Sequence, residues 1–577
     1  MKKFIIIIIL GILSEEIFCA LLLNVPQTIT QPNGTIINCF ATGDEFYSWL
    51  HDNNNFTIVR NPDTGYYCYA ILVDNVLVAS PFIVGVNDPV SSGLISGTNI
   101  NLQQINSYSP MYAPAISNPT INNPKNINNL VVFIRFADQS EFPFLQSFYY
   151  DLFNNNLTNV GSMYNYFKEI SYGTTNIISS FYPSNNGTTI ISYKDAHIRD
   201  FYRPRSQVGD SGYVTTEYPY EGNTRTEREN SLFKNALNFI SNQIPSTLNL
   251  DDNNDGFIDN ICFIIRGEAS HDLKENILWP HQSKFNPEFK NTINSSLTHS
   301  YNVQIESEVD VSVLCHEMCH TLGAPDLYQL SPPYGLPAGY WDLMCVNHYL
   351  PASTCAYIKY KYLGFIEEIP EINVSGRYTI NSLTNQSNNC FKIATSNPSE
   401  YFVLEYRKKS GIFETMIPGS GLLIYRINEN IIGNLNGPPY GIYLYRPNGT
   451  ISTNGNLEIS NYDSFFGRNI FNSMSNPNTF LSDGSVIDNL VIKNILLNEN
   501  TASFDFRLCQ NTDVLLSNTD DLPEVTNAVN SILTNGKVTV KSTDNIIFEA
   551  GLEIILNSGF EVQNGGELKL EIVFCGE

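Results

Sequence analysis

The sequence has few basic residues for its length and few long apolar runs. Its 577 residues include 32 Lys and Arg against 57 Asp and Glu, a formal net charge of −25. Proteins hold nucleic acid largely by neutralising phosphates with basic side chains, so this balance argues against a nucleic-acid partner. No apolar run beyond the amino-terminal segment approaches the length that crosses a bilayer, so we expect no membrane span. The acidic excess itself favours solubility.

The first twenty residues have the pattern of a secretion signal. Two lysines precede an apolar run from Phe4 to Leu13, which is long enough for a signal h-region and too short to span a bilayer. A clear small-x-small cleavage motif is lacking, and Phe18 precedes Cys19 where a lipoprotein signal carries a small residue. We therefore expect residues 1–20 to be a cleaved signal peptide without a lipid anchor, and the mature protein to be secreted and extracellular.

The most informative segment runs from His316 to His320 and contains a His-Glu-x-x-His motif. Residues four apart share one face of a helix, so His316 and His320 can bind a single ion. Zinc favours imidazole nitrogen, and catalytic zinc sites take three protein ligands and keep a fourth position for water. Glu317 can reach that water as a general base. The motif predicts a zinc hydrolase; a pair of solvated or core histidines is the alternative.

Residues after the motif extend it. Gly323 stands where the helix has to stop, at a position that suits positive φ. Asp326 lies three residues further on, where metzincin-type sites place their third ligand. Those sites usually carry His there, but a carboxylate is an acceptable zinc ligand, so Asp326 is predicted as a ligand and the third ligand stays open. Met344 follows in a tight segment similar to a Met-turn, although a methionine can also simply fill a core.

These residues resemble the immune inhibitor A family of secreted bacterial zinc metalloproteases. The resemblance covers residues 24–508 and is most specific from His316 to Tyr328 and from Gly339 to Met344. The other similar segments lie in the pro-region, in the first strand of the catalytic domain and in later strands: Thr30–Thr35, Gly43–Tyr47, Asn129–Gln139, Glu400–Arg407 and Gly419–Tyr425.

The resemblance implies an α/β metzincin-like zinc protease catalytic domain, flanked by an N-terminal α+β pro-region and C-terminal all-β domains. It implies a secreted zinc endopeptidase made as a zymogen, and we expect a monomer that acts on protein or peptide substrates. The predicted boundaries are a signal peptide at 1–20, a pro-region at 24–115, a catalytic domain at 127–368, a β-sandwich-like domain at 369–508 and a small repetitive β appendage at 512–577.

A linker rich in Asn, Pro and Ser separates the pro-region from the catalytic domain. Exposed polar linkers of this kind are sites of proteolytic nicking, which favours a cleavable pro-region over a permanently attached domain. Apolar periodicity predicts the secondary structure near the motif. The expected elements are a strand at Leu130–Phe136, helical segments within Ser147–Thr174 and at Glu229–Gln243, a strand at Ile261–Ile265 and a helix at Thr354–Leu363 that ends at Gly364.

Asp251, Asn253 and Asp255 place side-chain oxygens at alternate positions before Gly256, as in a calcium loop. The match is partial, because the bidentate acid expected at the twelfth place would be Cys262. A calcium-binding turn and a plain Asx-rich turn therefore both remain open.

Eleven cysteines occur, and loss of Cys19 with the signal would leave an even number that an oxidising compartment could pair. Position along the chain favours the pairs Cys39–Cys68 and Cys509–Cys575. Cys315 and Cys319 lie in the motif helix, about 100° around the axis from the histidines. Thiolate ligation of zinc is conceivable there, but packing as small apolar residues or pairing with Cys345 or Cys355 is favoured.

Two other functions compete with proteolysis of proteins. One is a zinc hydrolase of cell-wall peptides. The other is a catalytically inactive adhesin built on a protease fold, with its function in the C-terminal β domains. The presence of Glu317 argues against the adhesin, because an inactive site has no chemical need for that acid.

Overall fold

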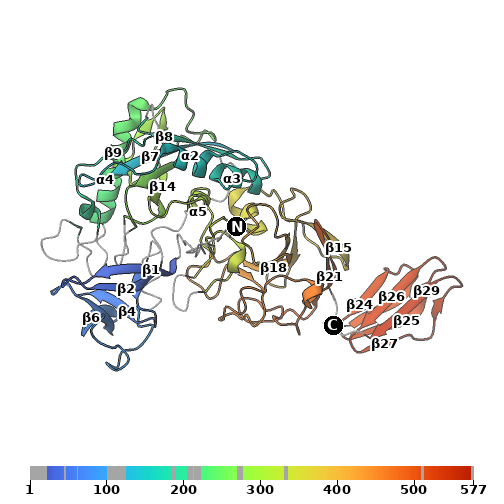
Figure 1. Ribbon diagram of the computed structural model, residues 1–577. Helices are drawn as coiled ribbons and strands as arrows, with labels where there is room; N and C mark the ends of the chain where they lie inside the picture. The colour runs from blue at the N-terminus through green and yellow to red at the C-terminus, as the bar shows by residue number, and fades with distance from the viewer. Residues whose placement is uncertain are drawn as a thin grey trace, which may run out of the picture.

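A computed structural model describes residues 22–43, 47–61, 63–100, 125–184, 189–203, 212–213, 223–269, 277–329, 335–508 and 513–572 (Figure 1). The predicted signal peptide, the Asn/Pro/Ser-rich linker and the Cys509–Cys575 pair lie outside these residues. Strands dominate, with 36% of residues in strands and 14% in helices. Among the described residues, no helix combines the length and the apolar character needed to cross a membrane.

The amino-terminal segment forms one antiparallel sheet in which each strand pairs with the next in sequence. Its strands are β1 (Leu22–Thr30), β2 (Ile36–Gly43), β3 (Ser48–His51), β4 (Thr57–Arg60), β5 (Tyr67–Val73) and β6 (Val76–Ile83). The α+β expectation for this region is not met within its described residues, which form strands and turns and no helix. The reason is local: Ile37, Cys39 and Ala41 alternate with more exposed residues, the period of a strand.

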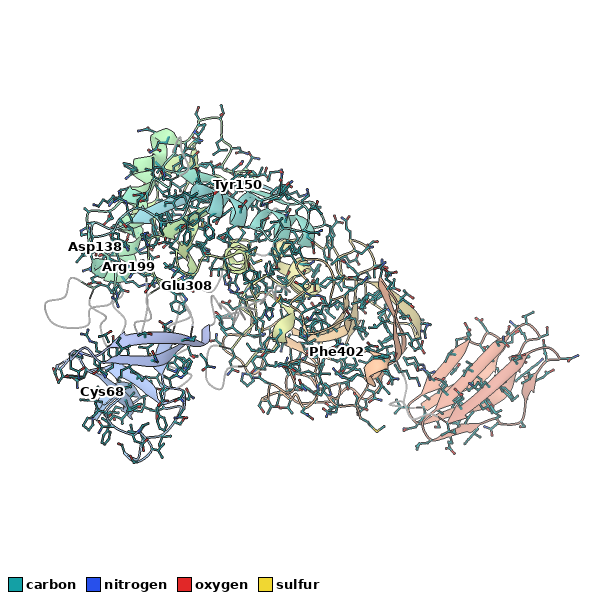
Figure 2. All side chains as sticks on the ribbon, in the orientation of Figure 1. Cys68, Asp138, Tyr150, Arg199, Glu308 and Phe402 are labelled. Carbon is teal, nitrogen blue, oxygen red and sulfur yellow. The ribbon has the colours of Figure 1, made fainter. Side chains whose placement is uncertain are left out.

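The predicted disulfide between Cys39 and Cys68 is wrong, because both are buried free thiols. Cys39 lies on β2 and Cys68 on β5, and two strands separate them in the sheet. Cys39 packs in the same apolar cluster as Tyr69. Successive side chains of a strand point to opposite faces, so Cys68, the neighbour of Tyr69, points away from that cluster (Figure 2 labels Cys68).

The central sheet has the strand order β11-β14-β10-β7-β8, with β9 beside the end of β7. All neighbours are parallel except β11, which is antiparallel to β14. The strands are β7 (Asn126–Arg135), β8 (Asn176–Tyr182), β9 (Tyr193–Lys194), β10 (Ile261–Ile265), β11 (His281–Lys284) and β14 (Ser300–Ile305); β12 (Thr292–Ile293) and β13 (Ser296–Leu297) form a separate small ribbon. The continuous apolar runs of β7 and β10 are typical of parallel strands covered on both faces.

Helices cover both faces of this sheet (Figure 1). Val131 and Phe133 of β7 pack with α2 (Gln146–Asn154), α3 (Met163–Ile170) and α5 (Val311–Thr321) on one face. Leu130 and Val132 pack with α4 (Asn223–Ile240) on the other. The short helical turns are η1 (Arg199–Tyr202), η2 (Ser241–Gln243), η3 (Pro287–Phe289), η4 (Gly339–Trp341), α6 (Ala356–Ile358), η5 (Lys359–Leu363) and η6 (Ser464–Phe466).

The element predictions near the motif hold. The strand predicted at 261–265 is β10, and the helix predicted at 354–363 is α6 with the π-turn η5. That helix ends at Gly364, whose φ of 68° is a left-handed conformation that glycine adopts at low cost.

Residues 369–508 form two packed antiparallel sheets, with the orders β15-β22-β21-β20 and β16-β17-β18-β19. Their strands are β15 (Gly376–Asn381), β16 (Cys390–Ala394), β17 (Glu400–Arg407), β18 (Gly421–Asn428), β19 (Ile442–Leu444), β20 (Ile470–Phe471), β21 (Leu490–Leu497) and β22 (Thr501–Leu508). Phe402 of β17 lies inside this sandwich (Figure 2). The next residue, Val403, points the other way and joins the core that contains α5. The sandwich and the helix therefore share one core, which crosses the boundary expected at residue 368.

The carboxy-terminal segment is a parallel β solenoid that projects from the sandwich (Figure 1). Ile532 pairs with Ile554 and Asn545 pairs with Glu567, 22 residues apart, whereas Asp513 of the first coil pairs with Ser531, 18 residues on. The strands are β23 (Asp513–Thr519), β24 (Val525–Ala528), β25 (Ser531–Val540), β26 (Asn545–Ala550), β27 (Glu553–Ile555), β28 (Phe560–Val562) and β29 (Glu567–Ile572). The repetitive β appendage expected from the sequence is thus a solenoid, in which each coil packs against the next.

Candidate metal centre

Helix α5 carries the motif and follows β14 directly. The Asp310 side chain accepts a hydrogen bond from the Val313 backbone N–H at 2.8 Å and so caps the helix. At the other end Gly323 has a φ of +101°, and a Cβ there would meet no atom within 4 Å. Glycine is therefore favoured at this position by backbone conformation and not by lack of space.

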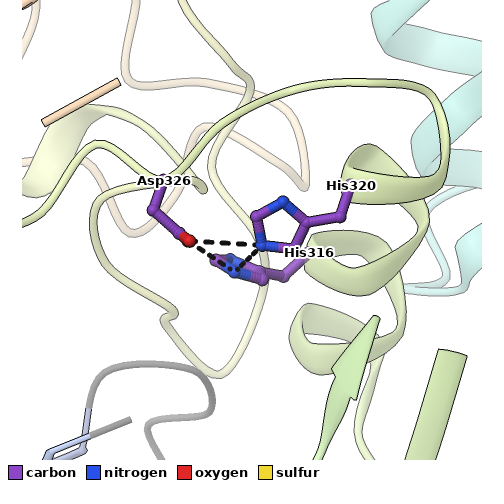
Figure 3. Close-up of side chains that lie close together, drawn as sticks. All are labelled: His316, His320 and Asp326. Atoms are coloured by element: carbon purple, nitrogen blue, oxygen red, sulfur yellow. Dashed lines mark hydrogen bonds and ion pairs between the residues drawn. The ribbon is translucent and has the colours of Figure 1, made fainter. Parts of the chain in front are cut away.

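The structure brings His316, His320 and Asp326 together (Figure 3). The two Nε2 atoms are 3.0 Å apart, and Asp326 Oδ1 lies 3.2 Å from each of them. Zinc bonds of 2.0–2.1 Å in tetrahedral geometry would place ligand atoms about 3.3 Å apart. The three atoms thus already form a triangle of the right size for one face of such a site.

The second nitrogen of each imidazole faces a backbone carbonyl. His320 Nδ1 lies 2.8 Å from Ala324 O, and His316 Nδ1 lies 3.3 Å from Leu343 O. If Nδ1–H donates to the carbonyl, Nε2 keeps its lone pair for a cation. Bonds of this kind fix the tautomer and the ring orientation in metal-binding histidines.

Met344 lies in a buried segment that contacts the loop carrying Asp326. Its side chain is fully buried in the same core as α5, and its carbonyl accepts a hydrogen bond from Leu327 N at 2.8 Å. Asp342 holds this segment in place, because its carboxylate accepts from Met344 N at 2.8 Å and from Cys355 N at 2.7 Å. The methionine segment therefore supports both the His316 ring, through Leu343, and the Asp326 loop.

Glu317 is completely buried, and burial raises the pKa of its carboxyl group. Both of its carboxylate oxygens lack a hydrogen-bond partner among the described residues. The His316 and His320 rings are close enough to interact with it electrostatically. An unpaired buried carboxylate is costly, so its retention beside the two rings points to a functional partner such as water or substrate.

The group formed by His316, His320 and Asp326 favours binding of a positive charge. Burial works against a charged His320, but the adjacent Asp326 carboxylate outweighs this and raises the pKa of His320 to about 9. Burial likewise disfavours the Asp326 anion, but His320 and His316 hold the pKa of that carboxyl well below its usual range. Two ring nitrogens and one carboxylate oxygen converge on one point, and either a proton or a metal ion there satisfies all three. The donor set of two imidazoles and one carboxylate fits zinc.

The predicted calcium loop has its oxygens turned toward its own backbone. Asp251 Oδ2 accepts from Gly256 N at 2.8 Å, and Asp255 Oδ1 accepts from Phe257 N at 2.9 Å. Asn253 Oδ1 lies 3.2 Å from Asp255 N. These bonds are those of an Asx-rich turn, the alternative that the sequence left open, and calcium binding there stays a prediction.

The cysteines near the motif are neutral thiols that pack in the core. Cys315 and Cys319 are fully buried, and burial raises the pKa of each well above its usual range. Neither belongs to the candidate metal group, and Cys345 and Cys355 are also unpaired. The packing interpretation holds, and the predicted pairing with Cys345 or Cys355 is wrong.

Sequence reasoning missed a line of buried amides beneath the end of α5. Asn260 Oδ1 accepts from Thr321 Oγ1 at 3.0 Å and from Asn302 Nδ2 at 3.2 Å. Asn260 Nδ2 in turn donates to Asn129 Oδ1 at 2.7 Å, and Asn129 Nδ2 donates to Ser179 Oγ at 2.9 Å. The line joins the residue after His320 to three strands of the sheet. Isolated asparagines in strands carry no sequence signal for such a role.

Sequence reasoning also missed a buried charge cluster that joins the segment around Met344 to β17. Arg407 is fully buried and donates to Trp341 O at 2.8 Å and to Ser353 O at 3.1 Å. Its charge is paired with Glu414 at 2.7 Å and with Glu405 at 3.3 Å. The cluster therefore connects the segment around Trp341 and Ser353, next to the candidate site, to strand β17 of the sandwich.

No family model matches the chain, and no curated protein matches it.

Proposed function

We propose that this protein is a secreted zinc-dependent endopeptidase of the immune inhibitor A type. The observation that carries the proposal is the triangle of His316 Nε2, His320 Nε2 and Asp326 Oδ1, with the unpaired carboxylate of Glu317 beside it. Its size and donor atoms fit zinc. The motif, its glycine and the buried methionine segment support the same assignment.

Zinc bound by these three residues would polarise a peptide carbonyl and lower the pKa of a water molecule. Glu317 acts as the general base: it removes a proton from the attacking water and delivers it to the leaving amine. Its buried position favours this role, because burial raises the pKa of the carboxyl group and so makes it a stronger base toward the water proton.

Strand β11 offers a place for an extended substrate. Within the described residues it pairs only with β14, so one edge carries no strand, and it packs beside α5. An extended peptide can add to such an edge through main-chain hydrogen bonds, which recognise peptides largely irrespective of sequence. This supports protein substrates over small molecules.

The proposal is tested with Glu317→Gln in the mature protein. We expect zinc content equal to wild type and loss of casein cleavage by at least about 100-fold, since general-base catalysis contributes 10²–10⁴-fold. Glu288→Gln, an exposed acid on η3, is the matched control and should behave as wild type. Full activity of Glu317→Gln would refute the role of Glu317.

Cleavage assays with casein and with peptidoglycan, together with the zinc content, separate the competing functions. Cleavage of isolated peptidoglycan without cleavage of casein would favour a cell-wall hydrolase. Stoichiometric zinc without turnover of either substrate would favour a binding protein on a protease fold.

A further inference from the structure

The Gly433–Asn434 turn lies against the loop that carries Asp326. This turn belongs to the connection between β18 and β19, in the part of the chain expected to be a separate β domain. The Asn434 backbone N–H donates to Asp326 O at 2.9 Å. Its side-chain Nδ2 donates to Leu327 O, also at 2.9 Å. One residue thus binds two consecutive carbonyls of the ligand loop.

Asn434 is itself held rigidly from the other side. It is fully buried, its Nδ2 also donates to Ile442 O at 2.8 Å, and its Oδ1 accepts from Ile442 N at 3.0 Å. Ile442 is the first residue of β19, which pairs with β18 in the sandwich. The Asp326 loop is therefore connected through one asparagine to the hydrogen-bonded frame of a sheet.

Gly433 makes this close approach possible. Its φ of +58° is left-handed, and a Cβ at this position would lie 2.6 Å from Asp326 O and 2.9 Å from Pro325 Cβ. Any other residue would have to push the loop away. The requirement for glycine therefore comes both from conformation and from contact with the ligand residue.

Asp326 needs such support more than the other two ligands do. His316 and His320 are fixed by α5 and by their Nδ1 contacts, whereas Asp326 lies in irregular chain after the helix. Its Oδ1 faces only the two histidine nitrogens with which it would share a metal ion, and no other described side chain orients that atom. Its position comes from the backbone, which Asn434 holds on one side and Met344 on the other, through Leu327 N.

We infer that the Gly433–Asn434 turn is the positioning element for the ligand Asp326, so that the β sandwich completes the metal site. The inference rests on the proposed function, because it assigns Asp326 to a metal ion. Groups of this kind, which orient a ligand without touching the metal, typically change metal affinity 10–100-fold when removed.

The test measures zinc affinity of the full-length mature protein by competition with a chelator. Asn434→Ala removes the two hydrogen bonds that Nδ2 donates and the one that Oδ1 accepts, and should weaken zinc binding about 10–100-fold. The absorption spectrum of the cobalt-loaded protein should change as well, because the geometry of the carboxylate ligand changes. Gly433→Ala keeps every donor and displaces the loop by contact, so it should give the same two effects if Asn434→Ala fails to fold.

Asn428→Ala is the matched control. Asn428 is also buried and lies at the end of β18, but its amide donates to Glu400 and Ser482, within the sandwich. If loosening the sandwich were enough to disturb the site, this variant would weaken zinc binding too. We expect its zinc affinity and cobalt spectrum to equal those of wild type.

A double-mutant cycle isolates the route of action. In an Asp326→Ala background, Asn434→Ala should cause no further loss of zinc affinity, because the ligand that it positions is absent. Unchanged affinity of Asn434→Ala in the wild-type background, or an equal loss in both backgrounds, would overturn the inference. Failure of the wild-type protein to bind zinc would overturn the proposed function, and the inference with it.

Discussion

Single residues at the candidate metal centre are recognisable in the sequence only where their roles depend on close neighbours. His316, Glu317 and His320 lie within one helical turn, so their spacing alone predicts a shared face. Asp326 is close enough for a motif to include it. Asn434 is different: 107 residues separate it from its partner Leu327, and nothing in its local sequence distinguishes it from any other asparagine in a turn.

The residue Asp310 gives a prediction on pH. Burial raises the pKa of this capping carboxyl to about 7, above its value in an unfolded chain. The folded state therefore binds more protons than the unfolded state between about pH 4 and pH 7, and this group lowers stability as pH rises through that window. Asp310→Asn keeps the cap and removes the titration. Its stability relative to wild type should increase with pH, by up to about 4 kcal/mol for a shift of three units.

The measurement is the thermal unfolding midpoint of both proteins at pH 5, 6.5 and 8 in the presence of a chelator. Asp151→Asn, an exposed acid on α2, serves as the control and should show no such trend. A constant difference between Asp310→Asn and wild type at the three pH values would contradict the assignment.

At the scale of elements, the end of α5 determines where Asp326, the candidate third ligand, lies. The helix stops at Gly323, and the chain then turns so that Asp326 faces back toward the histidines. The buried amides of Asn129, Asn260 and Asn302 fix Thr321 to the sheet at the same end. The helix is thus anchored at the turn that carries His320.

Gly323→Ala tests this helix end. Because a Cβ there meets no atom within 4 Å, its cost is that of the left-handed backbone alone, about 1–2 kcal/mol. We expect a lower thermal midpoint and weaker zinc binding, both measured on the mature protein. Gly376→Ala is the matched control, since Gly376 is exposed, lacks positive φ and has only Tyr378 at 4.0 Å. Equal stability of Gly323→Ala and wild type would contradict the expected cost of a left-handed backbone at this position.

At the scale of the whole molecule, the sandwich and the candidate catalytic unit form one structure. Val403, Leu423 and Tyr425 of β17 and β18 pack in the core that contains α5. Arg407 adds buried polar links to Trp341 and Ser353. The solenoid differs: its polar links to the rest of the described chain are few, chiefly the Arg507–Glu549 ion pair and a contact between Asn527 and Ser375.

Truncation should reveal this difference. A chain that ends after residue 508 should keep its zinc affinity and its casein cleavage, because it retains the shared core. A chain that ends after residue 368 should aggregate and bind no zinc, because it exposes the apolar surface that β17 and β18 cover and loses Asn434. Size-exclusion chromatography and metal analysis provide the readout. A soluble, zinc-binding chain of residues 1–368 would refute the shared core.

The sequence by itself determined the candidate ligands, the candidate general base, the strand and helices around them and the repetitive carboxy-terminal strands, because each depends on spacing over a few turns or on a short repeat. The tertiary structure alone decided the rest. The all-strand form of the described amino-terminal segment, the free thiols of Cys39 and Cys68 and the Asx-turn geometry at Asp251 depend on which faces meet. The contacts of β17 and of Asn434 with the candidate metal centre join segments far apart in the chain, and no local sequence pattern predicts such contacts.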